Sequence, residues 1–410
     1  MKLLLKHDTY YKFLGTCTEC GHCRETCTSL SCAGLNLGQV AKRMLQHERE
    51  VVAAAAESGA EPAPADLARA IRRDKELIQS VRGCFFCTQC EQACFAHNDV
   101  CELIYACRVD FQNLGLIPRA AWSSVLVDEE WDIFTAYRAI YGIGYGDLVK
   151  HVDSDWGPAQ TDCEIAFFPG CALTSYAPEL ARETFAAVEE YGGKTTLIDR
   201  CCGSSLKSAG FYDRAVELCK RTVAEIQTSG AHTIVCVCPG CANALRETLG
   251  EQGLSEIEVT TVSEFLLEKG FKPARDLSDL HLCFSRSCQD RDGKCLEATR
   301  KLLGATAENA SIFKGCCGAG GAVGPFDDNR KTMQIETKLG CAQDGDTLVS
   351  ICPTCTYTYA FELLGAPRNI SNKHYLELLF DGQFDWEKNF EQLTSMWSGE
   401  YGAWLASVFS

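Results

Sequence analysis

Residues 314–326 read Lys-Gly-Cys-Cys-Gly-Ala-Gly-Gly-Ala-Val-Gly-Pro-Phe, with two adjacent cysteines, Cys316 and Cys317, ahead of a run of glycines. A disulfide between neighbouring residues is strained, and two exposed thiols are open to oxidation, so such a pair is unfavourable unless something binds both sulfurs. The glycines indicate a backbone that turns tightly or lies against a bulky object. The same device occurs earlier as Cys201-Cys202-Gly203. We therefore expect a group to be bound at both places.

The sequence around these two elements is an internal repeat, and the cysteines occur at matching positions in both copies. Residues 232–241 align with residues 346–355 at an offset of 114, and the two Cys-Cys-Gly elements lie 115 residues apart. Each half holds five cysteines in one order: a single cysteine, the adjacent pair, and Cys-Pro-x-Cys. The first cysteine set is Cys171, Cys201, Cys202, Cys238 and Cys241, and the second cysteine set is Cys288, Cys316, Cys317, Cys352 and Cys355.

Each half also alternates short apolar runs with helical segments. Apolar runs typical of buried parallel strands lie at residues 165–168, 233–237 and 347–351. Helical patterns follow at residues 178–191, 212–228, 242–249, 327–339 and 356–364. This alternation predicts parallel sheets covered on both faces, with ligands bound beyond the carboxyl ends of the strands. The five cysteines of a set follow such ends, so they can converge on one group, and five thiolates exceed what one tetrahedral zinc ion needs.

The N-terminal third carries a different cysteine pattern, Cys-x-x-Cys-x-x-Cys-x-x-x-Cys, which begins at Cys17 and again at Cys84. This is the spacing of two-cluster ferredoxins, in which three close cysteines bind one [4Fe–4S] cubane and the fourth crosses to the other cluster. A pair of zinc sites is the alternative, but a third cysteine at this spacing has no use around tetrahedral zinc. We expect one cubane on Cys17, Cys20, Cys23 and Cys94, and the other on Cys84, Cys87, Cys90 and Cys27.

The composition agrees with iron–sulfur sites in a reducing compartment. The chain of 410 residues has 27 cysteines, whereas disulfide-rich secreted scaffolds are short, and its N-terminal apolar run is too short for a signal peptide. The net charge of −16 argues against nucleic acid as a partner. No stretch approaches the ~20 apolar residues of a membrane helix. We expect a cytoplasmic protein that reaches the membrane, if at all, through a partner subunit. Six cysteines outside the sets are expected to be buried fillers: Cys32, Cys101, Cys107, Cys219, Cys236 and Cys341.

These patterns predict an α/β protein with a mostly helical N-terminal ferredoxin-like domain and two pseudo-repeated cysteine-rich domains with short parallel sheets. Two helices, at residues 40–56 and 66–81, are expected as an insertion between the ferredoxin motifs. The expected domains are a ferredoxin-like domain at 1–117, an aromatic-rich helical linker at 118–160, cysteine-rich domains at 161–275 and 276–380, and a C-terminal tail at 381–410. The tail carries an apolar face, which docks on the chain's own core or on a partner: Trp397, Tyr401, Trp404, Leu405, Val408 and Phe409.

The motifs together resemble the heterodisulfide reductase family of iron–sulfur proteins, whose cysteine-rich domains carry Cys…Cys-Cys-Gly…Cys-Pro-x-Cys twice behind a two-cluster ferredoxin domain. The domain order resembles the D subunit of that family, in effect a fusion of its C and B subunits. Related proteins include the DsrK-type subunits of sulfate reducers and the iron–sulfur subunits of glycolate, glycerol-3-phosphate and lactate dehydrogenases.

The resemblance implies one or two noncubane [4Fe–4S] clusters on these cysteine sets, at which a disulfide is cleaved by electrons delivered one at a time. Both sets are complete, which favours two such clusters over one. We expect the second cysteine set to be the catalytic one. The chain departs from many relatives there, because they read His-Asp-Pro-Cys-His where this chain reads Ser285-Arg286-Ser287-Cys288-Gln289. No imidazole flanks Cys288, and Arg286 is a candidate for binding a substrate carboxylate or phosphonate instead.

Two functions remain open from the sequence. In the first, electrons enter through the ferredoxin-like domain and the cysteine-rich body reduces a disulfide or oxidises two thiols. In the second, the chain relays electrons within a flavin-dependent 2-hydroxy acid or glycerol-3-phosphate dehydrogenase complex. The chain has no nucleotide-binding fingerprint, so a flavin would belong to a partner flavoprotein. A cytochrome b-type or quinone-linked membrane subunit is a further expected partner, and a small-molecule thiol or disulfide is the expected substrate.

Overall fold

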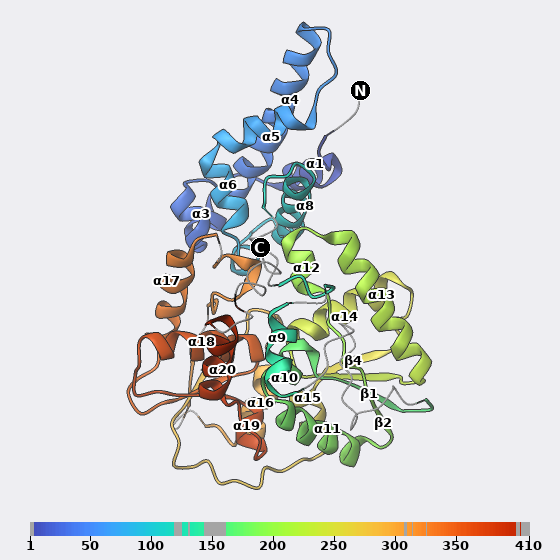
Figure 1. The fold of residues 1–410 in the computed structure, drawn as a ribbon, viewed down its shortest axis with the longest axis vertical. Helices are drawn as coiled ribbons and strands as arrows, with labels where there is room; N and C mark the ends of the chain where they lie inside the picture. The colour runs from blue at the N-terminus through green and yellow to red at the C-terminus, as the bar shows by residue number, and fades with distance from the viewer. Residues whose placement is uncertain are drawn as a thin grey trace. The chain divides into compact units, whose positions relative to one another are not determined.

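The computed structural model describes residues 4–118, 125–129, 132–142, 161–306, 310–313, 315–324, 326–398 and 402. Helices predominate, and the strands form two four-stranded sheets (Figure 1). The chain divides into two compact units. The helical unit comprises Met1–Trp122, Ser205–Tyr212 and Gly318–Met333, and the sheet unit comprises Ser123–Ser204, Asp213–Cys317 and Gln334–Ser410. The expected α/β class with a helical N-terminal region is confirmed.

The N-terminal part of the helical unit consists of eight helices among the described residues. Their bounds are α1 His7–Thr16, α2 His22–Thr26, α3 Thr28–Ala33, α4 Leu37–Glu57, α5 Pro64–Arg73, α6 Lys75–Arg82, α7 Gln89–Gln92 and α8 Val100–Asn113. The helix expected at 66–81 is in fact two, because the chain breaks at Asp74, whose carboxylate accepts a hydrogen bond from the Leu77 amide at 3.0 Å and so caps α6.

The buried arginine Arg108 of α8 forms hydrogen bonds to several separate segments of the helical unit. Its guanidinium donates hydrogen bonds to five carbonyl oxygens: those of Val81 (3.1 Å), Arg82 (3.1 Å), Cys84 (2.9 Å), Ser208 (2.6 Å) and Gly321 (2.9 Å). Three of these carbonyls lie at the start of the second ferredoxin motif, and two lie in the segments that follow the adjacent cysteine pairs. Arg108 thereby stabilises the packing of residues 205–212 and 318–333 in the same unit as the ferredoxin motifs.

The glycine run that follows Cys317 has a specific packing reason. A Cβ atom on Gly320 would lie 2.2 Å from the carbonyl oxygen of Phe85, and one on Gly321 would lie 2.0 Å from that of Cys84. Gly321 also has a φ of +68°, in the left-handed region that favours glycine. These two glycines are therefore required by close contact with backbone, and the bulky object that the sequence suggested is another loop of the chain.

The two sheets of the sheet unit have the same topology. The first has the order β2-β1-β3-β4 and the second β6-β5-β7-β8, and every pairing is parallel. The strands are β1 Ile165–Phe168, β2 Thr195–Leu197, β3 Thr233–Cys236, β4 Glu258–Thr261, β5 Leu282–Ser285, β6 Ala310–Phe313, β7 Thr347–Ser350 and β8 Ser371–His374. The internal strands β1, β3 and β7 match the expected apolar runs. Edge strands such as β8, which reads Ser-Asn-Lys-His, lack an apolar pattern and were missed.

Helices cover both faces of the first sheet (Figure 1). Ile165 and Phe167 of β1 pack with residues of α11 Pro178–Gly192 and α15 Val262–Glu268. Ala166 and Phe168 pack on the opposite face with α13 Tyr212–Ser229 and α14 Pro239–Glu251. The further helices are α9 Ile133–Ile140, α10 Gly170–Tyr176, α12 Ser204–Ala209, α16 Lys294–Leu302, α17 Asp328–Leu339, α18 Pro353–Gly365, α19 Leu376–Leu379 and α20 Trp386–Ser398, with a short 3₁₀ turn η3 at Gly320–Ala322.

Gly192, at the end of α11, is packed closely against buried side chains, so we expect a larger residue there to destabilise the protein. A Cβ on Gly192 would lie 2.1 Å from Ile165 Cδ1 and 2.7 Å from Phe265 Cζ, both of which are buried. We expect Gly192→Ala to destabilise the protein by about 1–3 kcal/mol through overpacking, measured as a lower unfolding temperature in calorimetry. Gly365→Ala is the control, because nothing lies within 4 Å of a Cβ at Gly365. Equal unfolding temperatures for the two variants would contradict the prediction.

The expected linker and tail are only partly within the described residues. In α9, Tyr137 is fully buried and its ring packs edge-on against Tyr176 and Tyr357. The side chains of the apolar face expected from residue 397 to 409 lie outside the described part of the chain, and the five domain boundaries stay predictions. None of the described helices combines the length and apolar character that crossing a membrane requires.

Candidate iron–sulfur centres

The two ferredoxin-type motifs fold into two groups of cysteines, each of which includes one member from the other motif. Cys17, Cys20, Cys23 and Cys94 line a hollow of about 400 Å³, counting its open mouth. Cys27 lies beside the cysteines of the second motif: burial above all, together with the charges of Cys27 and Cys87, raises the pKa of Cys84 to about 12. Burial and the same neighbours raise the pKa of Cys90. The structure thus brings together the two groups of four that the spacing predicts, and their role as ligands stays a prediction.

Both motifs turn in the same unusual way between their cysteines. Glu19 and Phe86, two residues after the first cysteine of each motif, have φ angles of 55° and 53°, and Gly21 and Thr88, four residues after it, have 90° and 59°. Non-glycine residues in this left-handed region are rare, and they concentrate at functional sites. The turn directs backbone amides toward sulfur, as in the hydrogen bond from Phe86 N to Cys84 Sγ at 3.4 Å.

The helical unit also leaves room beside one of these sulfurs. A Cβ on Gly38, in α4, would lie 2.9 Å from Cys17 Sγ. The helix approaches the cysteine this closely because residue 38 is glycine. Four thiols around a hollow, with backbone donors nearby and a glycine beside one sulfur, fit a [4Fe–4S] cluster in donor chemistry.

In the sheet unit, helix starts after the strands position the Cys-Pro-x-Cys motifs. Cys238 follows β3 and is the N-cap of α14, and Cys352 follows β7 and is the N-cap of α18, each with proline at the first helical position. The second cysteine of each motif, Cys241 or Cys355, lies in the first helical turn. Helix N-termini favour negative charge, so this position suits cysteines that bind metal as thiolates.

Eight of the ten sulfurs in the two cysteine sets lie in one continuous row. Sγ–Sγ distances are 3.8 Å from Cys201 to Cys171, 3.7 Å from Cys238 to Cys352, and 3.1 Å from Cys355 to Cys317. The remaining links are thiol contacts of Cys202 with Cys201 and Cys241, of Cys241 with Cys238, and of Cys352 with Cys355. Eight of the ten thiols therefore form the row, and the contact between Cys238 and Cys352 joins the first set to the second.

Within this row the thiols differ in acidity. Hydrogen bonds from Cys201 and Cys241 lower the pKa of Cys202, and hydrogen bonds from Cys238 and Cys355 lower that of Cys352. These hydrogen bonds favour the thiolate form of Cys202 and of Cys352, and thiolate is the form in which cysteine binds metal. The pKa values of Cys201, Cys238, Cys241 and Cys355 are raised, because these thiols donate the hydrogen bonds within the buried row.

The residues of the row fit iron–sulfur chemistry. Among the described residues, no three cysteine, histidine or carboxylate side chains surround one point as a single metal ion requires. The thiols are instead spread along a row, and soft thiolate donors in such numbers suit a multinuclear cluster. Gly170 gives the row space, since a Cβ there would lie 3.2 Å from Cys241 Sγ.

Three buried polar residues near the second cysteine set were not singled out from the sequence: Lys338, Tyr359 and His374. His374 ends β8, and burial lowers its pKa to about 3 although the charge of Cys352 acts in the opposite direction. Leu376 N approaches its Nδ1 at 3.5 Å, and the ring also lies beside the backbone of Ile351. An imidazole is therefore present near the second cysteine set, brought there from the edge strand rather than from the residues that flank Cys288.

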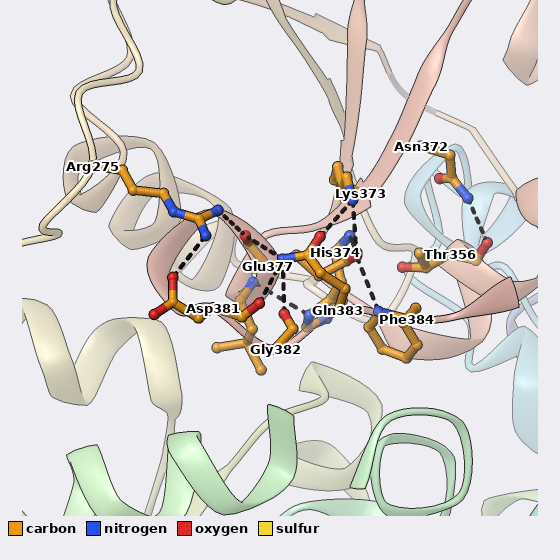
Figure 2. A network of polar contacts seen from close by, with 11 residues as sticks. Arg275, Thr356, Asn372, Lys373, His374, Glu377, Asp381, Gly382, Gln383 and Phe384 are labelled. Carbon is orange, nitrogen blue, oxygen red and sulfur yellow. Dashed lines mark hydrogen bonds and ion pairs between the residues drawn. The ribbon is translucent and has the colours of Figure 1, made fainter. Parts of the chain in front are cut away.

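Glu377, in α19 directly after β8, bonds to the backbone at the end of this strand (Figure 2). The carboxylate of the buried Glu377 accepts hydrogen bonds from His374 N at 2.6 Å and from Phe384 N at 3.1 Å, and it pairs with Lys373 Nζ at 3.3 Å. Arg275 donates to the Glu377 carbonyl at 3.2 Å and to Asp381 at 2.8 Å. The Glu377 carboxylate thus binds two backbone amides and the Lys373 ammonium, and these bonds hold the end of β8 against α19 and the segment after it.

The remaining expectations concern Arg286 and the cysteines outside the two sets. Arg286 donates to the carbonyls of Asp290 and Arg291 at 2.9 and 3.0 Å, so its guanidinium shapes its own loop. Cys32 and Cys341 are exposed, and the expectation that they are buried was wrong. Cys32 is the last but one residue of α3, and Cys341 lies two residues beyond the end of α17, so a helical pattern does not imply burial at either place. The other four expected fillers are buried: Cys101, Cys107, Cys219 and Cys236.

A model of the cysteine-rich domain family named CCG matches the chain twice, over residues 165–246 and 283–359. The chain contains two CCG cysteine-rich domains. Their matches begin at or beside β1 and β5 and extend into α14 and α18, so the repeat seen in the sequence is a repeat of this domain.

Curated relatives extend the similarity beyond the CCG domains. The D subunit of dihydromethanophenazine:CoB–CoM heterodisulfide reductase from Methanosarcina acetivorans is 25% identical over 366 residues, which cover 83% of this chain and 87% of the relative. An uncharacterized iron–sulfur protein of Methanococcus maripaludis is 26% identical over 51% of this chain and 44% of its own length. The B subunit of fumarate reductase (CoM/CoB) from Methanothermobacter marburgensis is 26% identical over 53% and 45%. These similarities support an iron–sulfur oxidoreductase subunit that works within a complex.

Proposed function

We propose that this chain passes electrons through two cubane [4Fe–4S] clusters in its N-terminal part to noncubane [4Fe–4S] clusters on the two cysteine sets, where a disulfide is reduced or two thiols are oxidised. The continuous row of eight sulfurs, joined between the sets by Cys238 and Cys352 at 3.7 Å, is the observation that carries the proposal. A protein that only transfers electrons does not need two matched five-cysteine sites in contact with each other. Similarity to a heterodisulfide reductase subunit over most of both chains is the second support.

The proposed reaction balances with two electrons and two protons. The sulfur–sulfur bond of the substrate breaks, and each sulfur takes one electron and one proton to become a thiol. The clusters, when bound, would supply the electrons one at a time. Residues of this chain would keep the reacting sulfurs away from water, since Cys202, Cys241, Cys317 and Cys355 are all less than a tenth exposed. In the complex, electrons would arrive from a flavoprotein or from a cytochrome b-type or quinone-linked membrane subunit, with the chain in the cytoplasm or at the cytoplasmic face of the membrane.

A relay function is the second candidate, and the similarity to the B subunit of fumarate reductase favours it. In this function the organic chemistry belongs to a flavoprotein partner, and the cysteine sets only conduct. The substrate of such a complex would be a 2-hydroxy acid or glycerol 3-phosphate.

Electron paramagnetic resonance on the oxidised protein, incubated anaerobically with low-molecular-weight thiols, separates the two functions. We expect a preparation with about four irons in each of four clusters, and a new paramagnetic species when a thiol sulfur binds cluster iron. Absence of a new species with every thiol tried, together with co-purification of a flavoprotein that oxidises a hydroxy acid, would establish the relay. Zinc in place of iron would contradict both functions.

A further inference from the structure

Lys338 of α17 is a buried lysine with no carboxylate partner among the described residues. It is only 2% exposed. Its Nζ lies 3.4 Å from the hydroxyl of Ser285, at the end of β5, and 4.5 Å from the centre of the Phe313 ring. A buried ammonium without a carboxylate is costly unless other negative charge lies nearby.

The negative charge near Lys338 comes from the second cysteine set. Burial lowers the pKa of Lys338, while the charges of Cys355, Cys317, Cys316 and Cys288 act in the opposite direction. Four of the five cysteines in this set are therefore close enough for their charge to act on the Lys338 ammonium. Tyr359 lies near three of the same cysteines, and its hydroxyl is 2.8 Å from that of Ser285. Ser285 thus joins the ammonium to a second polar group on the same side of the set.

The first cysteine set provides an internal comparison because the fold repeats. The buried residues of α13, the helix that corresponds to α17, are all uncharged: Ala215, Leu218, Cys219, Thr222, Val223, Ile226 and Ser229. Phe168 ends β1 where Ser285 ends β5, and Leu245 in α14 corresponds to Tyr359 at the offset of 114. Both are fully buried and apolar. The polar surroundings therefore belong to the second set and are absent from the equivalent places of the first.

The buried arginine near the first set does not fill the same role. Arg138 and Asp199 are both buried, and they form an ion pair at 2.9 Å that also includes Thr174. The charges of this pair cancel, so they add no net positive charge. Lys338 differs from Arg138 because the groups near it are the thiols of the second set, and no carboxylate among the described residues cancels its charge.

We propose that Lys338 is a positioning residue that holds a fixed positive charge beside the second cysteine set, so that the cluster of this set is reduced more readily than the cluster of the first. This inference rests on the proposed function, because it requires clusters on both sets. The reduced cluster carries one more negative charge than the oxidised one, and a nearby cation stabilises it preferentially. Ser285 and Phe313 fix the position of the ammonium. Electrons that enter the row of sulfurs would therefore collect at the second set.

Redox titration of the purified full-length protein, followed by electron paramagnetic resonance, tests the inference. The signal of the second-set cluster is assigned by its absence from Cys316→Ser. We expect Lys338→Met and Lys338→Gln to shift the midpoint potential of that signal downward, with about a tenfold lower ratio of reduced to oxidised cluster at the wild-type midpoint. Lys338→Arg should remain close to wild type, and the potential of the first-set cluster should not change. Lys301→Met, which removes an exposed lysine of the same half, is the control.

Each outcome decides the matter. An unchanged potential in Lys338→Met with full iron content would overturn the inference and leave the proposed function standing. If both neutral variants lost the second cluster while Lys338→Arg kept it, the charge would be needed to hold the reducible cluster, in support of the inference. Loss of iron from all three variants would mean that Lys338 acts in packing only. A wild-type protein without a second-set cluster would refute the proposed function and this inference together.

Discussion

Replacing Cys317 with serine is expected to remove the cluster of the second cysteine set and to abolish the thiol-induced paramagnetic species. Cys317 Sγ lies 3.1 Å from Cys355 Sγ, and both residues are buried in the row of sulfurs. A serine hydroxyl is a harder and far less acidic ligand than a thiol, so it does not replace the thiolate on iron. We expect the loss of about four irons of about sixteen, measured by iron analysis, with the signals of the N-terminal cubanes retained.

Cys341→Ser is the matched control for this variant. Cys341 belongs to the same half of the chain, but it is exposed and lies outside both cysteine sets. Its replacement should leave iron content, cluster signals and the response to thiols unchanged. A Cys317→Ser protein with all of its iron and an intact response would show that the second set is not a ligand set.

Replacing Arg108 with methionine is expected to destabilise the helical unit by about 5 kcal/mol. The guanidinium is fully buried and donates to five carbonyl oxygens, from Val81, Arg82, Cys84, Ser208 and Gly321. Methionine has a similar length and no donor, so these carbonyls would lose their partners in a place that water reaches poorly. The measurements are the unfolding temperature and the rate at which a protease cleaves the N-terminal part of the chain.

The same variant should also disturb the second ferredoxin motif. Arg108 bonds the carbonyl of Cys84, and its positive charge partly offsets the raised pKa of that thiol. We therefore expect faster loss of cubane iron to a chelator in Arg108→Met. Arg69→Met is the control, because the Arg69 side chain is 65% exposed and pairs with Asp66 in its own helix. Equal stability of the two variants would show that the five hydrogen bonds of Arg108 contribute little.

Three of the four central strands, β1, β3 and β7, followed from the sequence because each is a short apolar run, and the cysteine groups followed from their spacing. The fourth central strand, β5, is fully buried but was not predicted. β1 and β7 are fully buried apolar runs, and the Cys-Pro-x-Cys motifs follow from a proline at the first turn of α14 and α18. The edge strands β2, β4, β6 and β8 were not predicted, because an edge strand has one unpaired side and tolerates polar residues. The break between α5 and α6 at Asp74 was not predicted, because residues typical of helices continue on both sides of it.

The order and spacing of the cysteines were enough to predict which four sulfurs lie together in the helical unit, because the two-cluster ferredoxin pattern assigns the fourth cysteine of each motif to the other group. The internal repeat was enough to assign five cysteines to each half of the sheet unit. Neither pattern showed that the sets touch through Cys238 and Cys352, that Gly320 and Gly321 are glycines because they pack against Cys84 and Phe85, or that Lys338 lies beside the second set. The tertiary structure decided these three features. A buried polar or glycine residue is explained by the atoms it meets, and those atoms come from segments up to hundreds of residues away, whose packing depends on the whole fold rather than on any local pattern.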